Sequence, residues 1–249
     1  MRMTKRMMAV GLILALCFSF ASCGKANTVE TVPMLVTDGS TLTYNEFLAT
    51  NYEEQVTVAG YVQAKMIYAT DRANTSLFVK DQTSDSCYFI FNAMMSQETY
   101  NSITEGTPVK ITGTKTIFSN EVEIANATVE VLNGTPYVAN PLDITTIFSS
   151  SASDYINRKI QLTGFTVVPF EDGSTFHFGY SGSGSNGDAI YFQASKDGIT
   201  YMFVVNQYLT DPSTSVYTAV QGLTAGQTIT IQGYMYFYED PLVMVTSVA

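Results

Sequence analysis

The sequence predicts a mainly β protein that contains two copies of one small barrel. Two observations support this fold class. The stretch "ITEGTPVKITG" at 103–113 is matched by "LTAGQTITIQG" at 223–233. In addition, apolar and polar residues alternate over short runs such as "QVTVAGYVQAK" at 55–65. A period of two is typical of β-strands, and no long amphipathic helix pattern competes with it.

The strands of the two copies can be matched in order. Each copy begins with a glycine-containing strand, "QVTVAGYVQ" (55–63) in the first and "KIQLTGFTV" (159–167) in the second. A later apolar run ends on asparagine in both copies, as "CYFIFN" (87–92) and "YMFVVN" (201–206). Other short β-branched or aromatic runs, such as "SLFVKD", are separated from these by turn residues.

One short helix is predicted between the third and fourth strands of each copy. Ser96 is a candidate N-cap for "QETYNSI", and Asp211 followed by Pro212 is the equivalent signal in the second copy. The order strand, strand, strand, helix, strand, strand is that of the oligonucleotide/oligosaccharide-binding (OB) fold, a five-stranded Greek-key barrel. Glycines inside the strands mark the bulges or sharp bends of such a barrel: Gly60, Gly113, Gly164 and Gly233.

The N-terminus has the layout of a signal peptide. Basic residues precede an apolar run at 7–20, which is too short to span a bilayer comfortably as a permanent helix. The following Phe20-Ala21-Ser22-Cys23 resembles the bacterial lipoprotein lipobox, although Phe20 replaces the usual aliphatic residue. The resemblance implies that Cys23 is acylated and anchors the protein to a membrane. An ordinary secretory signal that contains a cysteine is the alternative.

The whole arrangement resembles the tandem OB-fold lipoproteins of bacterial cell envelopes, over about residues 41–249. The resemblance implies a lipid-anchored protein whose folded part lies outside the cytoplasm, and it brings no catalytic residues with it. The predicted organisation is a signal peptide at 1–22, a flexible tether at 23–40, an OB-fold-like domain at 41–135, a linker at 136–142 and a second OB-fold-like domain at 143–249.

The charge argues against nucleic acid as the main partner. From Cys23 onward the chain holds all 22 acidic residues but only nine of the 12 basic ones, for a formal net charge of −13. Proteins that bind DNA or RNA gain affinity by neutralising phosphates with Lys and Arg. After Cys17 is removed and Cys23 acylated, Cys87 is left alone, so no intramolecular disulfide is expected.

The sequence offers little for catalysis. His177, the only histidine, lies in a long insertion at 171–188 without a second metal ligand nearby. A Cys87–His177 dyad would be needed for a cysteine enzyme, but Cys87 starts an apolar strand, where free cysteine usually behaves as a small buried hydrophobe. We therefore expect no enzyme activity, no metal and no cofactor, and we interpret His177 as a loop residue that could contact a ligand.

Aromatic residues give the better indication of binding. OB folds hold ligands on the outer face of strands two and three and the loops around it, often by stacking on aromatic rings. We expect Tyr61 and Phe165 on the outward side of the first strands. In "YMYFYED", Tyr234, Tyr236 and Tyr238 share one side and would form a platform if that side faces outward. The alternative is that these tyrosines pack between the two domains or against the tether.

The sequence therefore predicts a membrane-anchored, non-catalytic binding lipoprotein whose ligand is a cell-surface protein, a peptide or a glycan. Nucleic-acid binding is the alternative. Its supporting residues are Lys65, Arg72 and Lys80, on or near the second-strand hairpin where OB folds that bind nucleic acid hold it. The second copy, with its long loop and tyrosines, is the expected functional one.

Overall fold

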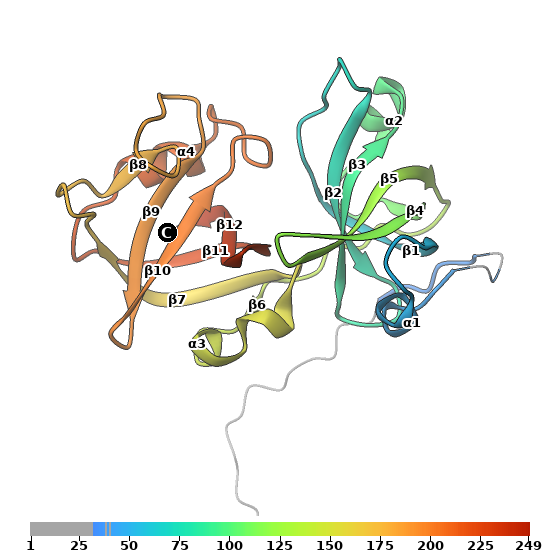
Figure 1. Ribbon diagram of the computed structural model, residues 1–249, viewed down its shortest axis with the longest axis horizontal. Helices are drawn as coiled ribbons and strands as arrows, with labels where there is room; N and C mark the ends of the chain where they lie inside the picture. The colour runs from blue at the N-terminus through green and yellow to red at the C-terminus, as the bar shows by residue number, and fades with distance from the viewer. Residues whose placement is uncertain (1–31, 38, 40) are drawn as a thin grey trace, which may run out of the picture. The chain divides into compact units, whose positions relative to one another are not determined.

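The computed structural model describes residues 32–37, 39 and 41–249 (Figure 1). The predicted signal peptide at 1–22, the predicted acylation site Cys23 and much of the predicted tether lie outside these residues. Residues 32–249 form one compact unit. Within the described part of the chain, no helix is both long and apolar enough to cross a bilayer.

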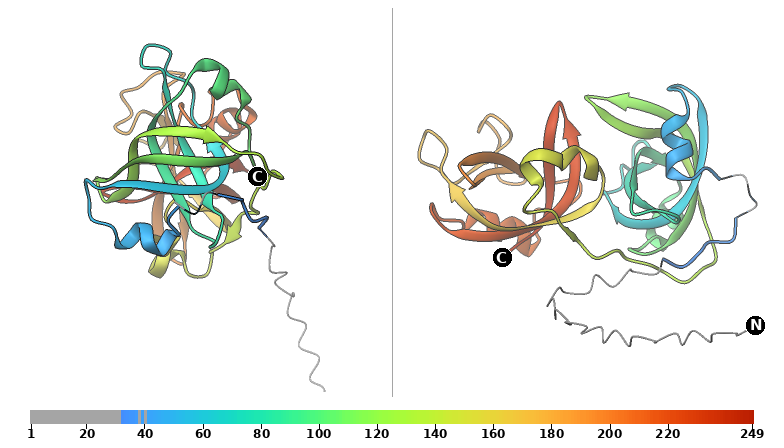
Figure 2. Two further views of the ribbon diagram at one scale, coloured as in Figure 1. Left: turned by 90° about the vertical axis from the view of Figure 1, so that its right-hand side faces the viewer. Right: turned by 90° about the horizontal axis from the view of Figure 1, so that it is seen from below.

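The first half of the chain folds into a closed five-stranded barrel with the strand order β1-β2-β3-β5-β4. Strand β1 pairs antiparallel with β2 and β4, whereas β3 and β5 pair parallel (Figure 2). This confirms the predicted barrel, with a helix between the third and fourth strands. The elements are α1 (Tyr44–Ala49), β1 (Gln55–Lys65), β2 (Asn74–Asp81), β3 (Cys87–Met94), α2 (Gln97–Ser102), β4 (Pro108–Phe118) and β5 (Glu121–Val131).

Both helices of this half begin at a side-chain cap. Ser96 accepts a hydrogen bond from the Thr99 N–H at 3.1 Å, which confirms the predicted cap of α2. The sequence analysis missed α1, although its start is a capping box in which Thr43 and Glu46 bond to each other's backbone N–H. The barrel interior is filled by alternating apolar residues, including Val56, Val58, Val62, Leu77, Val79, Ile90 and Ile111.

The second half forms a seven-stranded sheet with the order β6-β7-β11-β12-β10-β9-β8. Because β7 also pairs with β9, the strands β7, β9, β10, β12 and β11 close a ring of pairings in the same order as in the first barrel. The elements are β6 (Leu142–Asp143), α3 (Phe148–Ser151), η1 (Ala152–Tyr155), β7 (Lys159–Val168), β8 (Phe176–Phe178), β9 (Ile190–Lys196), β10 (Ile199–Val205), α4 (Ser215–Gln221), β11 (Thr228–Tyr238) and β12 (Asp240–Val248).

Two details of this half differ from the prediction. The insertion at 171–188, which we expected to be a loop throughout, contributes the short strand β8 on the edge of β9. Helix α4 begins three residues later than expected, after Thr214. Asp211 instead closes a turn, in which its carboxylate accepts from the Ser213 N–H at 2.8 Å.

The segment at 32–36, which we expected to be part of a free tether, packs on the first barrel. Leu35 is buried beside Ala59 and Tyr61, and its N–H donates to Gln82 Oε1 at 3.0 Å. The Tyr61 hydroxyl donates to the Pro33 carbonyl. The predicted linker also touches this barrel, because the Ala139 N–H donates to Gln63 Oε1 at 2.7 Å. Both segments are therefore held by β1.

Candidate functional site

The aromatic residues predicted to face outward on the first strands are both buried. Tyr61 does lie on the outer face of β1, but residues 32–35 and the ring of Tyr137, 5.5 Å away, cover it. Phe165 points inward, into the core of the second half. The reason is a β-bulge at Gly164, which has φ +71° and shifts the alternation by one residue, so that Leu162, Phe165 and Val167 share the interior.

Two of the three tyrosines predicted to form a platform are also covered. Tyr234 is buried and stacks on Phe78 of β2 at a ring distance of 4.4 Å. Tyr236 meets Phe89 of β3 edge-on at 5.2 Å. Tyr234 and Tyr236 therefore pack between the first and second halves of the compact unit, as the alternative expected, and do not face outward. The Tyr234 hydroxyl also donates to the Gln63 carbonyl at 2.7 Å.

These contacts remove one potential binding face. Phe78 and Phe89 lie on the outer side of β2 and β3, the face on which OB folds hold ligands. In this chain, that face packs against residues of β10, β11 and β12, including Val204 and Met244. The first barrel therefore uses its usual ligand face as a packing surface.

Tyr238, the third predicted tyrosine, is exposed and belongs to a group of rings that comes mainly from the second half. We define the aromatic surface as Tyr180, Tyr191, Tyr238 and Phe118. The side chains of Tyr180 and Tyr238 are 74% and 59% exposed. Tyr180 meets the half-buried Tyr191 edge-on at 5.5 Å, and Phe118 lies 6.4 Å from Tyr238. Burial raises the pKa of Tyr191, and the neighbouring hydroxyls of Tyr180 and Tyr238 raise it further.

Hairpin tips from both halves hold this surface together. The turn after Tyr238 donates its Glu239 N–H to the Ser119 carbonyl at 2.9 Å, and Asn120 Nδ2 donates to the Glu239 carbonyl at 3.1 Å. Phe118 directly precedes Ser119 and is thereby placed beside Tyr238. Sequence analysis missed Tyr180, Tyr191 and Phe118, because they come from the 171–188 insertion, the outer face of β9 and the tip of β4.

The predicted loop histidine has a structural environment of its own. The His177 ring stacks on Phe170 at 3.9 Å, and its Nε2 lies 3.0 Å from Asp172 Oδ2. Hydrogen bonds from Ser174, and then from His177, lower the pKa of Asp172 to about 2. These contacts fix the ring within its own loop.

The structure does not assemble the Cys87–His177 dyad. Cys87 starts β3 in the first barrel, whereas His177 lies on β8 in the second sheet. Burial raises the pKa of the Cys87 thiol to about 12, so it is protonated at neutral pH. A protonated, buried thiol is a poor nucleophile.

The lysines predicted for nucleic-acid binding are engaged in internal contacts. Lys65 Nζ donates to the carbonyls of Tyr100 and Ile103 at 2.8 and 2.7 Å. Lys80 is buried and donates to the Ser84 carbonyl at 2.6 Å. Both ammonium groups satisfy backbone carbonyls. Arg72, the third predicted cation, is exposed and lies 3.7 Å from the carboxylate of Asp71, so these three residues do not form a cationic groove.

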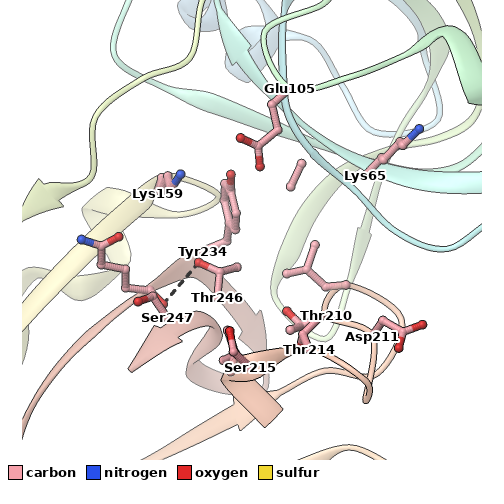
Figure 3. A pocket seen from close by; sticks show the side chains of 14 residues that line it. Lys65, Glu105, Lys159, Thr210, Asp211, Thr214, Ser215, Tyr234, Thr246 and Ser247 are labelled. Carbon is pink, nitrogen blue, oxygen red and sulfur yellow. Dashed lines mark hydrogen bonds between the residues drawn. The ribbon is translucent and has the colours of Figure 1, made fainter. Parts of the chain in front are cut away.

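A pocket of about 670 Å³ lies beside Tyr234 (Figure 3). It is bounded by residues of β1, the turn before β4, β7, β11, β12 and the segment that leads into α4. Most of its lining side chains are polar. They are Lys65, Glu105, Lys159, Thr210, Asp211, Thr214, Ser215, Gln232, Tyr234, Thr246 and Ser247, with Ala64, Leu209 and Val216 as apolar members.

No protein-family model matches the chain, and no curated protein matches its sequence. Solved structures similar to it include the Ifi202 HINa domain in complex with 20bp dsDNA, at 14% identity and a TM-score of 0.33, over 77% of this chain and 91% of that one. A murine DNA-binding protein bound to dsDNA has 11% identity and a TM-score of 0.33, over 77% and 90% of the two chains. A replication protein A heterotrimer bound to ssDNA has 10% identity and a TM-score of 0.32, over 78% and 50%. At these identities and TM-scores, the comparisons assign no ligand to this chain.

Proposed function

We propose that the protein is a non-catalytic binding lipoprotein with two OB-fold modules in tandem, and that the second module holds the ligand. The observation that carries this proposal is the aromatic surface, where Tyr180 and Tyr238 present exposed rings beside Tyr191. The outer face of β2 and β3 in the first module packs against the second module through Phe78 and Phe89, and the exposed rings of Tyr180 and Tyr238 lie outside that contact. One module therefore supports the other.

The chemistry of the surface favours a ligand without phosphate groups. Tyrosine rings offer apolar faces for stacking and hydroxyl groups for hydrogen bonds. Among the described cations, four lysines donate to backbone carbonyls: Lys65, Lys80, Lys115 and Lys196. The chain from Cys23 onward has a formal net charge of −13, which repels polyanions. We therefore propose an uncharged glycan chain or peptide as the ligand.

Nucleic-acid binding is the second candidate. The similar solved structures include complexes with double- and single-stranded DNA. Aromatic rings can also stack on bases, a contribution of about 1–3 kcal/mol per base. The fold analogy supports this candidate, whereas the internal contacts of the lysines oppose it.

The two candidates are separated by calorimetric titration of the whole chain in detergent with neutral glycans, peptides and single-stranded oligonucleotides. We expect Tyr180→Ala and Tyr238→Ala each to weaken glycan or peptide binding by about tenfold, because each removes one stacking ring. Affinity should barely change between low and high salt.

The matched control is Tyr208→Ala, which removes a tyrosine that is 53% exposed outside the aromatic surface and should leave binding unchanged. Oligonucleotide binding that weakens steeply as salt rises would support the second candidate instead. If no glycan or peptide bound, or if all three variants bound equally well, the proposed site would be wrong.

The anchor is tested separately in bacterial cells. We propose that Cys23 is acylated, on the basis of the preceding Phe20-Ala21-Ser22. Cys23→Ser should abolish incorporation of labelled fatty acid and release the protein from the membrane fraction, because two or three acyl chains provide the anchoring energy. Undiminished labelling of the variant would contradict this assignment.

A further inference from the structure

The pocket beside Tyr234 contains two charged groups that have no partner within the described residues. Lys159 at the start of β7 and Glu105 in the turn before β4 both line it. Neither side chain forms a hydrogen bond or an ion pair with another described residue, and the two do not pair with each other. Figure 3 shows them flanking the Tyr234 side chain. The other two charged groups are occupied, since Lys65 donates to carbonyls and Asp211 accepts from Ser213.

A buried hydroxyl in the same pocket also lacks a partner. Thr214 Oγ1 is shielded from solvent and forms no hydrogen bond with the described residues. Although Thr214 directly precedes α4, its side chain makes no capping bond. Buried polar atoms are rarely left unsatisfied, so this hydroxyl is available to bond to a molecule held in the pocket. Ser215 and Ser247 add two further hydroxyls to the lining.

We propose that this pocket binds a short peptide with free termini. The Lys159 ammonium would meet the terminal carboxylate, the Glu105 carboxylate would meet the terminal amine, and the hydroxyls would bond to the peptide backbone. A volume of about 670 Å³ falls within the range of sites that bury a small ligand, and it exceeds what a single amino acid fills. This site does not depend on the aromatic surface.

Blocked peptides test each contact. The whole chain in detergent is titrated calorimetrically with trialanine, its N-acetylated form and its C-amidated form. We expect trialanine to bind, and each blocking group to weaken binding by about tenfold through loss of a charge-assisted hydrogen bond.

The variants then assign the contacts. In Glu105→Gln, trialanine should bind about tenfold more weakly, and N-acetylation should have no additional effect. In Lys159→Met, trialanine should likewise bind about tenfold more weakly, and C-amidation should have no additional effect. Thr214→Val should weaken all three peptides. Melting temperatures close to the wild-type value would show that the variants fold.

Glu98→Gln serves as the matched control, because it removes an exposed carboxylate that does not line the pocket and should leave trialanine binding unchanged. Failure of trialanine to bind would overturn the peptide site, as would equal binding of the free and blocked forms. Since Tyr180 and Tyr238 do not line the pocket, and Glu105 and Lys159 do not belong to the aromatic surface, the variants show which of the two sites has failed.

Discussion

The Glu121→Gln variant is expected to be more stable than the wild-type chain at pH 8, by up to about 3 kcal/mol, and nearly equal to it at pH 4. Glu121 begins β5 and is fully buried. One carboxylate oxygen accepts from Asn157 Nδ2 at 2.7 Å, and the other accepts from the Phe237 N–H at 3.1 Å. Both donors belong to the second half, so this carboxyl group joins the two halves.

The direction of this stability difference follows from the pKa of Glu121. Burial raises it from the ordinary value of 4.5 to about 7, despite the opposing hydrogen bonds from Asn157 and Phe237. Between these two pH values, the folded chain keeps a proton that the unfolded chain has released. The free energy of unfolding therefore falls as pH rises from 4.5 through 7. A glutamine side chain has no charge to bury, so this contribution to the fall disappears.

The substitution also fits the hydrogen bonds at this position. The introduced amide oxygen can accept from the Phe237 N–H. The introduced NH₂ group can donate to Asn157 Oδ1 if the Asn157 amide turns over, and this oxygen is buried without a partner in the described part of the wild-type chain. The new side chain therefore needs no other rearrangement.

Urea unfolding of the wild-type chain and the variant at several pH values between 4 and 8 measures this effect. Glu98→Gln is the matched control, since Glu98 is exposed in the first turn of α2. The control should follow the wild-type pH dependence. A Glu121→Gln variant that is less stable than the wild type at pH 8 would show that the hydrogen bonds of the carboxylate outweigh its burial.

The Gly60→Ala variant is expected to lose more than about 4 kcal/mol of stability and to unfold partly at ordinary temperature. Gly60 lies in β1 opposite Asp81 of β2. A Cβ atom here would overlap the Lys80 carbonyl oxygen and lie 3.0 Å from its carbon. Because these atoms belong to the backbone of the neighbouring strand, no side-chain rotation relieves the clash, and β1 and β2 must separate.

Circular dichroism during urea unfolding measures this loss. Gly222→Ala is the control, because the nearest atom to its Cβ is the Ala219 carbonyl oxygen at 3.5 Å and its φ of −88° suits alanine. The control should change stability by less than about 1 kcal/mol. Equal stability of the two variants would contradict the close approach of β1 and β2 at Gly60.

Local patterns predicted the strands and α2 well, because alternation and side-chain capping act over a few residues. Which residues of β7 face the core could not be predicted in the same way. Gly164 indicated a bulge, but a bulge reverses the facing of every later residue, and so Phe165 was assigned to the wrong side.

The sequence did not show which outward-facing residues are covered by other parts of the chain. Tyr61 was assigned to the correct face of β1, but local patterns cannot show that residues 32–35 lie over it. The packing of Tyr234 on Phe78 joins residues that are far apart in the chain. The aromatic surface likewise combines Tyr180 with Tyr238, which only the folded chain brings near the same ring, Tyr191.

The packed face of the first barrel changes what natural selection can act on in each half. A substitution at Phe78 or Phe89 removes buried packing and lowers the amount of folded protein in the cell. On the proposed function, a substitution at Tyr180 or Tyr238 leaves the core intact and alters ligand binding. We therefore expect related chains to hold the first pair nearly constant, while the second pair diverges.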